Sequence, residues 1–145
     1  MTLSEIHSKL ENYCAYQDRC TREVMTKLHT LQVEQNEALQ IVEMLKNDGF
    51  IDEERYVQSF IRGKSSLKQW GKQKIRLTLL QKGIDAQLID KHLGSINEQQ
   101  YADNLQAAIR KWTQSHGEIT QENTPKLYRH LLSKGYTYEE IKGIL

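Results

Sequence analysis

Residues that make turns are scarce in this chain, which has one proline and eight glycines among its 145 residues. A sheet of many short strands needs frequent turn signals, so this scarcity argues against an all-β fold. The sequence also has no apolar run near the eighteen or so residues of a membrane helix. Its first residues lack the basic start and apolar stretch of a signal peptide. We therefore expect a cytoplasmic protein with no membrane association.

The side chains of enzymatic and metal sites do not occur in the spacings that such sites need. Cys14 and Cys20 form no CxxC pair, so we expect both to be reduced thiols. The segment Gly63–Ser65 lacks the upstream glycine and strand of a phosphate-binding loop. No two histidines stand four residues apart and none adjoins a cysteine; the five are His7, His29, His92, His116 and His130. We therefore expect no catalytic residue, no cofactor and no metal site, and predict that the chain is not an enzyme.

Apolar side chains recur at helical spacing along the whole chain, which predicts nine helices and no strand. Gly83 and Gly135 each follow an apolar stripe that ends in Leu-Leu-x-Lys, so we expect both to adopt the left-handed conformation just beyond a helix. Asp52 is expected to cap the start of a helix, and Thr137 is expected to form a capping box with Glu140. The predicted fold class is therefore all-α.

One segment of the sequence occurs twice, at an offset of 52 residues. Leu79–Gly83 reads Leu-Leu-Gln-Lys-Gly, and Leu131–Gly135 reads Leu-Leu-Ser-Lys-Gly. Ile51–Glu53 returns 45 residues later as Ile96–Glu98. A fixed period of this kind indicates small units that bury their apolar faces by stacking on their neighbours. We predict one domain of tandem three-helix repeats, with units at about residues 1–66, 67–117 and 118–145 and the last unit truncated after its second helix.

Charge is distributed unevenly along the chain, although the net charge is only +1. Seven acidic residues and one basic residue lie between Glu34 and Glu54, whereas eight basic residues and no acidic residue lie between Arg55 and Lys82. A solvated helix face would normally mix both signs, so we favour a surface for phosphate groups or an acidic partner. Trp70 is expected to anchor the packing between two helices rather than to stack on bases. The predicted contact residues are Arg55, Arg62, Lys64, Lys68, Lys72, Lys74 and Arg76.

A series of motifs runs through the middle of the chain: Gly49-Phe50-Ile51-Asp52-Glu53-Glu54-Arg55-Tyr56-Val57, Ser59-Phe60-Ile61-Arg62, Gly71 with Lys74-Ile75, and Lys82-Gly83-Ile84. Together they resemble the RecX family of recombination regulators. Arg19 with Thr21–Val24 resembles the N-terminal segment of that family. Lys72 departs from the family pattern, which often has a proline or an aromatic residue there, and the first Lys-Gly turn is missing.

The resemblance implies a modular all-α protein that is bent into an elongated shape. It implies a monomer that associates with the RecA recombinase filament, lodges in its helical groove and restrains its ATPase and strand-exchange activities. RecA and the DNA inside its filament could both contact the basic segment. The alternative is a module that binds single- or double-stranded DNA by itself, without sequence preference. Binding of that second kind should weaken steeply with salt.

Overall fold

The structure, a computed structural model, describes all residues from 1 to 145 and consists of nine α-helices without a strand. The helices are α1 (Leu3–Tyr16), α2 (Thr21–Thr30), α3 (Gln35–Asn47), α4 (Glu53–Arg62), α5 (Lys72–Gln81), α6 (Ala86–Leu93), α7 (Glu98–His116), α8 (Thr124–Ser133) and α9 (Tyr138–Ile144). A π-helical segment, η1 (Gly63–Leu67), continues α4. None of these helices combines the length and the apolar composition needed to cross a membrane. The predicted all-α fold is confirmed.

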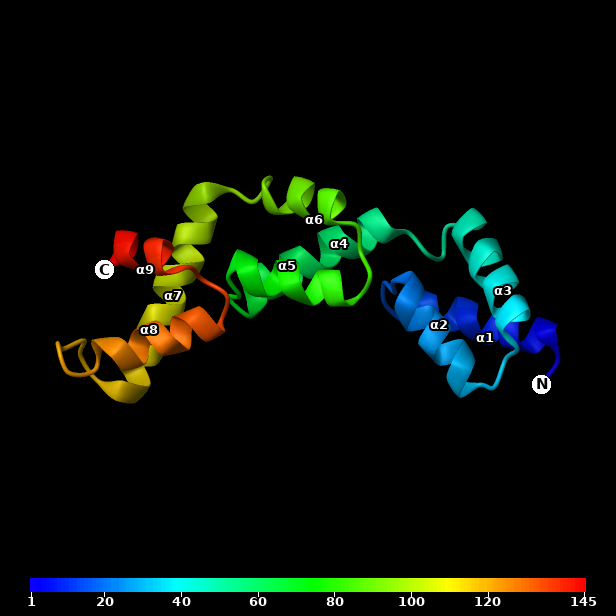
Figure 1. Cartoon of the computed structure of the whole chain (residues 1–145), viewed down its shortest axis with the longest axis horizontal. Coiled ribbons are helices and arrows are strands. Elements are labelled where there is room, and N and C mark those ends of the chain that lie inside the picture. Colours follow the sequence, from blue (N-terminus) through cyan, green and yellow to red (C-terminus); the bar gives the residue numbers. More distant parts are fainter.

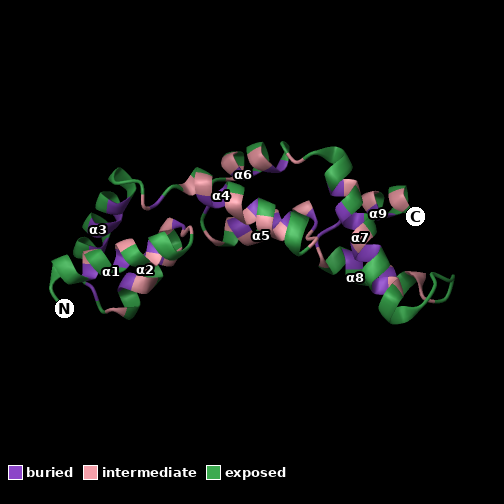
Figure 2. Cartoon of the chain, turned by 180° about the vertical axis from the view of Figure 1, so that it is seen from behind, coloured by how far each residue is buried: buried purple, intermediate pink, exposed green.

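The helices form three successive groups of three, each with its own hydrophobic core. The first group (α1–α3) is centred on Leu10, Leu28 and Leu45. The second group (α4–α6) buries Val57, Ile75 and Leu79, among others. The third group (α7–α9) is centred on Leu127, Leu131, Tyr136 and Ile141. Figure 1 shows the groups following one another in a bent row with the two termini at opposite ends, and Figure 2 shows that buried residues gather inside each group. The predicted elongated and curved repeat arrangement is therefore present.

The hydrophobic cores begin at α1, α4 and α7, whereas the units predicted from the repeat begin near residues 1, 67 and 118. The repeated segments compare equivalent helices of successive groups, α5 with α8 and α4 with α7. A repeat of this kind fixes the period of the architecture but not the helix at which each core starts. Whether residues 1–66, 67–117 and 118–145 each fold as a unit stays a prediction.

The helix ends follow the local signals in the sequence. Gly83 and Gly135 have φ of 81° and 104°, which confirms the left-handed conformation predicted for both. The Asp52 carboxylate accepts a hydrogen bond from the Arg55 N–H at the start of α4. Thr137 and Glu140 form the predicted capping box at the start of α9. These caps satisfy backbone groups that helix termini leave without an internal partner.

The first junction, between the first and second groups, is made largely by charged side chains. Asp18 accepts hydrogen bonds from Arg55 and Ser59, each at 2.8 Å. Glu53 accepts from the backbone N–H and the hydroxyl of Thr21, at 3.0 and 2.6 Å, and so caps the start of α2 from a neighbouring group. Glu53 therefore joins the groups, beyond the dipole role that its place in the first turn of α4 gives it.

The second junction, between the second and third groups, is made by the backbone. The N–H of Gly71 donates to the carbonyl of Lys134 at 2.7 Å, and the N–H of Gln73 donates to the carbonyl of Gly135 at 3.1 Å. A Cβ atom added at Gly71 would overlap the backbone of Gly135 and Tyr136. Glycine at both positions allows the start of α5 to lie directly against the turn between α8 and α9.

Aromatic side chains surround this backbone contact. The Tyr136 hydroxyl donates to the carbonyl of Gln69 at 2.9 Å, and the rings of Tyr101 and Tyr136 lie 5.5 Å apart. Burial raises the pKa of Tyr136, so its phenol stays protonated and able to donate this bond. Ile96 packs against both the second and the third cores. The second junction is thus closely packed and is not held by an ion pair.

Candidate anion-binding face

Three of the eight basic residues between Arg55 and Lys82 are neutralised by acids from other parts of the chain. Arg55 pairs with Asp18 at 2.8 Å and also donates to the carbonyls of Gly49 and Phe50. The other two ion pairs join Arg76 to Asp90 at 2.8 Å and Lys82 to Glu23 at 3.2 Å. These three cations hold helices together, and carboxylates of the same chain largely neutralise their charge.

The pKa of Asp18 reflects its position at the first junction. The hydrogen bond from Ser59 lowers the pKa of this carboxyl most, burial raises it, and Arg55 lowers it further. The charge of the exposed Arg62 also lowers this pKa, and Arg62 lines a hollow with His92 and Gln100 on the side of the third group. Arg55 and Arg62, two of the predicted contact residues, therefore belong to the environment of one carboxylate.

Two other lysines of the segment lie against one aromatic ring. The Nζ atoms of Lys64 and Lys74 lie 4.7 and 4.1 Å from the centroid of the Trp70 ring. Trp70 also packs against the second core and meets Phe60 edge-on, with ring centroids 6.3 Å apart. Trp70 is therefore a packing anchor, as predicted, and in addition attracts two ammonium groups through cation–π contacts.

Two lysines of the third group lie near Lys68 and Lys74. Lys134, at the end of α8, donates from Nζ to the backbone carbonyl of Lys68 at 2.9 Å. Burial lowers the pKa of Lys134 most, and the positive charges of Lys111, Lys74 and Lys68 lower it further. We call Lys64, Lys68, Lys74, Lys111 and Lys134 the lysine cluster. None of its members lies within ion-pair distance of a carboxylate.

The remaining predicted contact residue, Lys72, lies beside the cluster at the start of α5. Its Nζ lies 4.8 Å from the centroid of the Tyr101 ring, and its backbone N–H donates to the Tyr101 hydroxyl at 2.9 Å. The structure thus leaves Lys64, Lys68 and Lys74 without an ion pair, whereas Arg55 and Arg76 pair with Asp18 and Asp90. Which of the seven residues contact a partner stays a prediction.

Sequence reasoning missed Lys111 and Lys134. Lys134 belongs to the second copy of the repeated Lys-Gly turn, which is a local signal that could have drawn attention to it. Lys111 carries no such signal, because only the packing of α7 beside the second junction brings it near the other lysines.

The lysine cluster has the chemistry of an anion-binding surface. Ammonium groups that converge without a carboxylate repel one another, and after burial, the largest cause, the charges of neighbouring lysines lower the pKa of Lys134 further. A phosphate group or an acidic side chain placed among them would relieve the repulsion and gain several charge-assisted hydrogen bonds. The cluster spans two helical groups, so it suits an extended anionic partner better than a single small ion.

Comparison with known proteins agrees with this architecture. Residues 52–93, which contain α4–α6, match the family model described as RecX, second three-helix domain. The chain is 32% identical over 127 residues to regulatory protein RecX of Clostridium botulinum (strain Eklund 17B / Type B), covering 86% of this chain and 59% of that protein. It is 29% identical over 133 residues to regulatory protein RecX of Streptococcus agalactiae serotype V, covering 92% of this chain and 51% of that protein. The chain therefore spans only about half of the length of these relatives.

Two crystal structures share the fold. One, of regulatory protein RecX, superimposes with a TM-score of 0.84 at 22% identity and covers 98% of this chain and 70% of that chain. The other, of RecX from Lactobacillus salivarius, superimposes with a TM-score of 0.81 at 24% identity and covers 98% and 93%. The bent row of three-helix groups is thus the architecture of solved RecX proteins. From the matched family model, the sequence relatives and this shared fold together, we conclude that the chain belongs to the RecX family of regulatory proteins.

Proposed function

We propose that this chain binds the RecA recombinase filament and lowers its ATPase and strand-exchange activities, and that it thereby regulates recombination and DNA repair in the cytoplasm. It does so by binding, without catalysis of its own. The lysine cluster carries the proposal, because it is a concentrated positive surface that no acid of the chain neutralises. The RecA–DNA filament offers phosphate groups and acidic side chains to such a surface.

The shape of the molecule supports the same proposal. An elongated, bent row of helical groups can follow a helical groove over a long distance, and its contacts are spread along its length (Figure 1). The lysine cluster lies at the second junction, where α5 meets the end of α8, and so faces the partner from two helical groups at once. Binding that uses both groups would fail if they were separated.

The test is a titration of the purified chain into RecA that is hydrolysing ATP on single-stranded DNA. The proposal expects hydrolysis to fall as the chain is added, at concentrations where the chain does not bind the same DNA without RecA. Unchanged ATP hydrolysis at saturating concentrations of the chain would refute the proposal. Binding to a fluorescent single-stranded oligonucleotide is measured in parallel.

Independent DNA binding is the alternative, favoured by the same lysines and by the partly exposed Trp70. For that function, the logarithm of the association constant for the oligonucleotide should fall with the logarithm of the salt concentration, with a slope of about −0.7 per phosphate contacted. If inhibition of RecA appears only where the chain coats the DNA, the alternative replaces the proposed function.

A further inference from the structure

A second cluster of ionisable side chains lies in the first helical group, apart from the lysine cluster. His7 and Glu11 stand one turn apart on α1 and so share a face of that helix. The Nδ1 atom of His7 lies 3.9 Å from Oε1 of Glu11, which is too long for a hydrogen bond. The two groups are near enough to share a ligand but do not satisfy each other.

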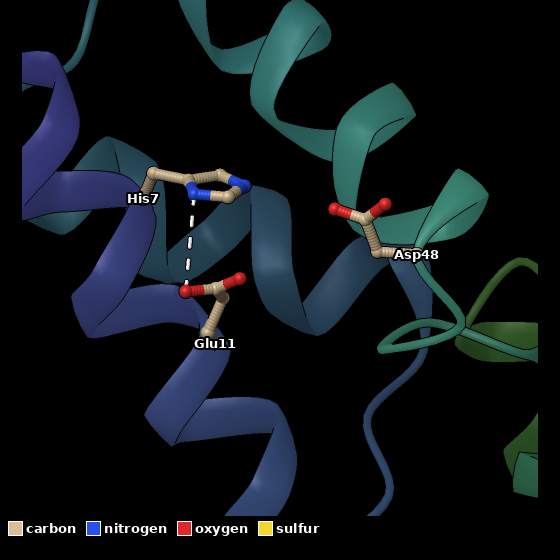
Figure 3. A group of neighbouring side chains, drawn as sticks. All are labelled: His7, Glu11 and Asp48. Carbon is tan, nitrogen blue, oxygen red and sulfur yellow. Dashed lines mark ion pairs between the residues drawn. The ribbon is translucent and has the colours of Figure 1, made fainter.

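Asp48 completes the cluster from a different element. It is the C-cap residue of α3, and Figure 3 shows the carboxylates of Asp48 and Glu11 turned toward the imidazole of His7. One potential ligand atom from each of the three residues lies within 4.8 Å of the other two. A carboxylate at the C-terminal end of a helix meets the negative end of the helix dipole, so Asp48 is placed where a cation would be favoured.

No basic side chain of the protein compensates these two acids. The ion pairs of the chain give neither Glu11 nor Asp48 a lysine or arginine partner. The Nε2 atom of His7 is buried and has no hydrogen-bond partner, although the side chain as a whole keeps 20% of its exposure. A buried polar atom without a partner is rare and costly, and an imidazole nitrogen beside two carboxylates offers its lone pair to a metal ion.

We propose that His7, Glu11 and Asp48 bind one divalent transition-metal ion of the zinc type. An imidazole nitrogen and two carboxylate oxygens form a ligand set that zinc accepts, and water fills the remaining position of such an open site. Zinc–ligand bonds of about 2.1 Å place tetrahedral ligand atoms about 3.4 Å apart. The three ligand atoms, which now lie within 4.8 Å of one another, would have to approach to about this spacing when the ion binds.

The ion fastens α1 to the end of α3 and so closes the first helical group. It would neutralise two carboxylates, and it would give the unpaired nitrogen of His7 a partner. The sequence contains one local signal for this site, the four-residue spacing of His7 and Glu11. A search for paired histidines or cysteines does not detect it. Asp48 has no local signal at all, because only the packing of α1 against α3 brings it to the site. The proposal is independent of the lysine cluster and of RecA.

The test titrates zinc chloride into the full chain, stripped of metal with a chelator, near neutral pH. Calorimetry should give one zinc ion per chain, and the melting midpoint should rise by several degrees because the ion binds the folded state. His7→Gln and Asp48→Asn should each weaken zinc binding by about tenfold or more. His29→Gln, an exposed histidine on α2, and Asp103→Asn, an exposed acid on α7, are the matched controls and should bind zinc as the wild type does.

Several outcomes would overturn the proposal. Wild-type protein that binds no zinc, or variants at His7 and Asp48 that bind it unchanged, would exclude the site. If His29→Gln removed binding as fully as His7→Gln, the ion would be held elsewhere. If His7→Gln lowered the melting midpoint while zinc had no effect on any variant, His7 would act only as a cationic partner of the two acids. Circular dichroism of each variant confirms that the helices are intact before zinc is added.

Discussion

The two junctions of the molecule join helical groups of the same kind by different chemistry. At the first junction, Arg55 and Lys82 meet Asp18 and Glu23, and their charges are neutralised within the chain. At the second junction, backbone hydrogen bonds from Gly71 and Gln73 hold the groups together. Ion pairs therefore hold the first junction together, whereas the lysines beside the second junction have no acidic partner.

This difference explains why residues of one basic segment have different roles. Arg55 and Lys74 both belong to the segment from Arg55 to Lys82, which contains no acidic residue. Arg55 is used at the first junction, whereas Lys74 lies against Trp70 beside the second junction without an acidic partner. The second junction is closed by backbone hydrogen bonds, and the lysines beside it have no carboxylate partner.

The largest effect is expected from closing the space at the second junction. Gly71→Ala adds a Cβ that overlaps the backbone of Gly135 and Tyr136, so α5 and the turn after α8 must separate. We expect a loss of about 3 kcal/mol or more in the free energy of unfolding, or undocking of the third group. Urea denaturation measures the first outcome, and small-angle scattering the second.

Gly63→Ala is the matched control for this substitution. Nothing lies within 4 Å of the added Cβ, and Gly63 already has helical φ and ψ of −65° and −45°. We expect this variant to be unchanged or more stable by about 0.5 kcal/mol. Equal stability of the two variants would mean that the glycine contact does not hold the second junction.

A smaller effect is expected at the first junction from Asp18→Ala. The substitution removes the hydrogen bonds from Arg55 and Ser59 and should cost about 1 kcal/mol, because both partners of the ion pair are partly exposed. The pKa of Asp18 is lowered in the folded state, so its stabilisation is complete above its unfolded pKa of about 3.9 and is lost as pH falls below that value.

Thermal melts over a pH series measure this effect. The difference between wild type and Asp18→Ala should be constant near neutral pH and should shrink on acidification below about pH 4. Asp103→Ala, which removes an exposed acid on α7, serves as the control and should change stability by less than about 0.5 kcal/mol. A difference that persists unchanged in acid would show that the Asp18 carboxylate is not what holds this junction.

The smallest effect concerns the repulsion within the lysine cluster. The pKa of Lys134 is lowered in the folded state, so its charge opposes folding below that pKa, and the opposition is relieved as pH rises toward the usual lysine value. Relative to Lys134→Met, the wild type should therefore gain about 0.5 kcal/mol between pH 8 and pH 10. Thermal melts of both proteins across this interval give the comparison. If wild type instead lost stability relative to Lys134→Met as the pH rises, the charge of Lys134 would not oppose folding.

Local features of the fold could be read from the sequence, and long-range ones could not. Gly83 and Gly135 were predictable as left-handed helix ends because the apolar stripe and the glycine are neighbours in the sequence. The contact of Gly71 with Gly135 was not predictable, because it joins residues of different helical groups and no local sequence pattern links the two. For the same reason, the sequence indicated a basic surface but could not separate the neutralised cations from the free ones.

The candidate site shows the same limit. Lys64, Lys68 and Lys74 were predicted as contacts from the absence of acids around them, and no ion pair of the chain neutralises any of the three. Arg76 looks the same in the sequence, yet Asp90 of the neighbouring helix pairs with it. Lys111 and Lys134 enter the cluster only through the packing of the third group.

The most direct test of the account compares two triple variants in the RecA ATPase titration. Lys64→Gln, Lys74→Gln and Lys134→Gln remove charge from the lysine cluster, and Lys9→Gln, Lys126→Gln and Lys142→Gln remove the same charge from exposed lysines elsewhere. Both should melt near the wild-type midpoint. The concentration for half-maximal inhibition should rise about tenfold or more for the first variant and less than about twofold for the second. Equal inhibition by the two variants would contradict the claim that the second junction presents its free lysines to an anionic partner.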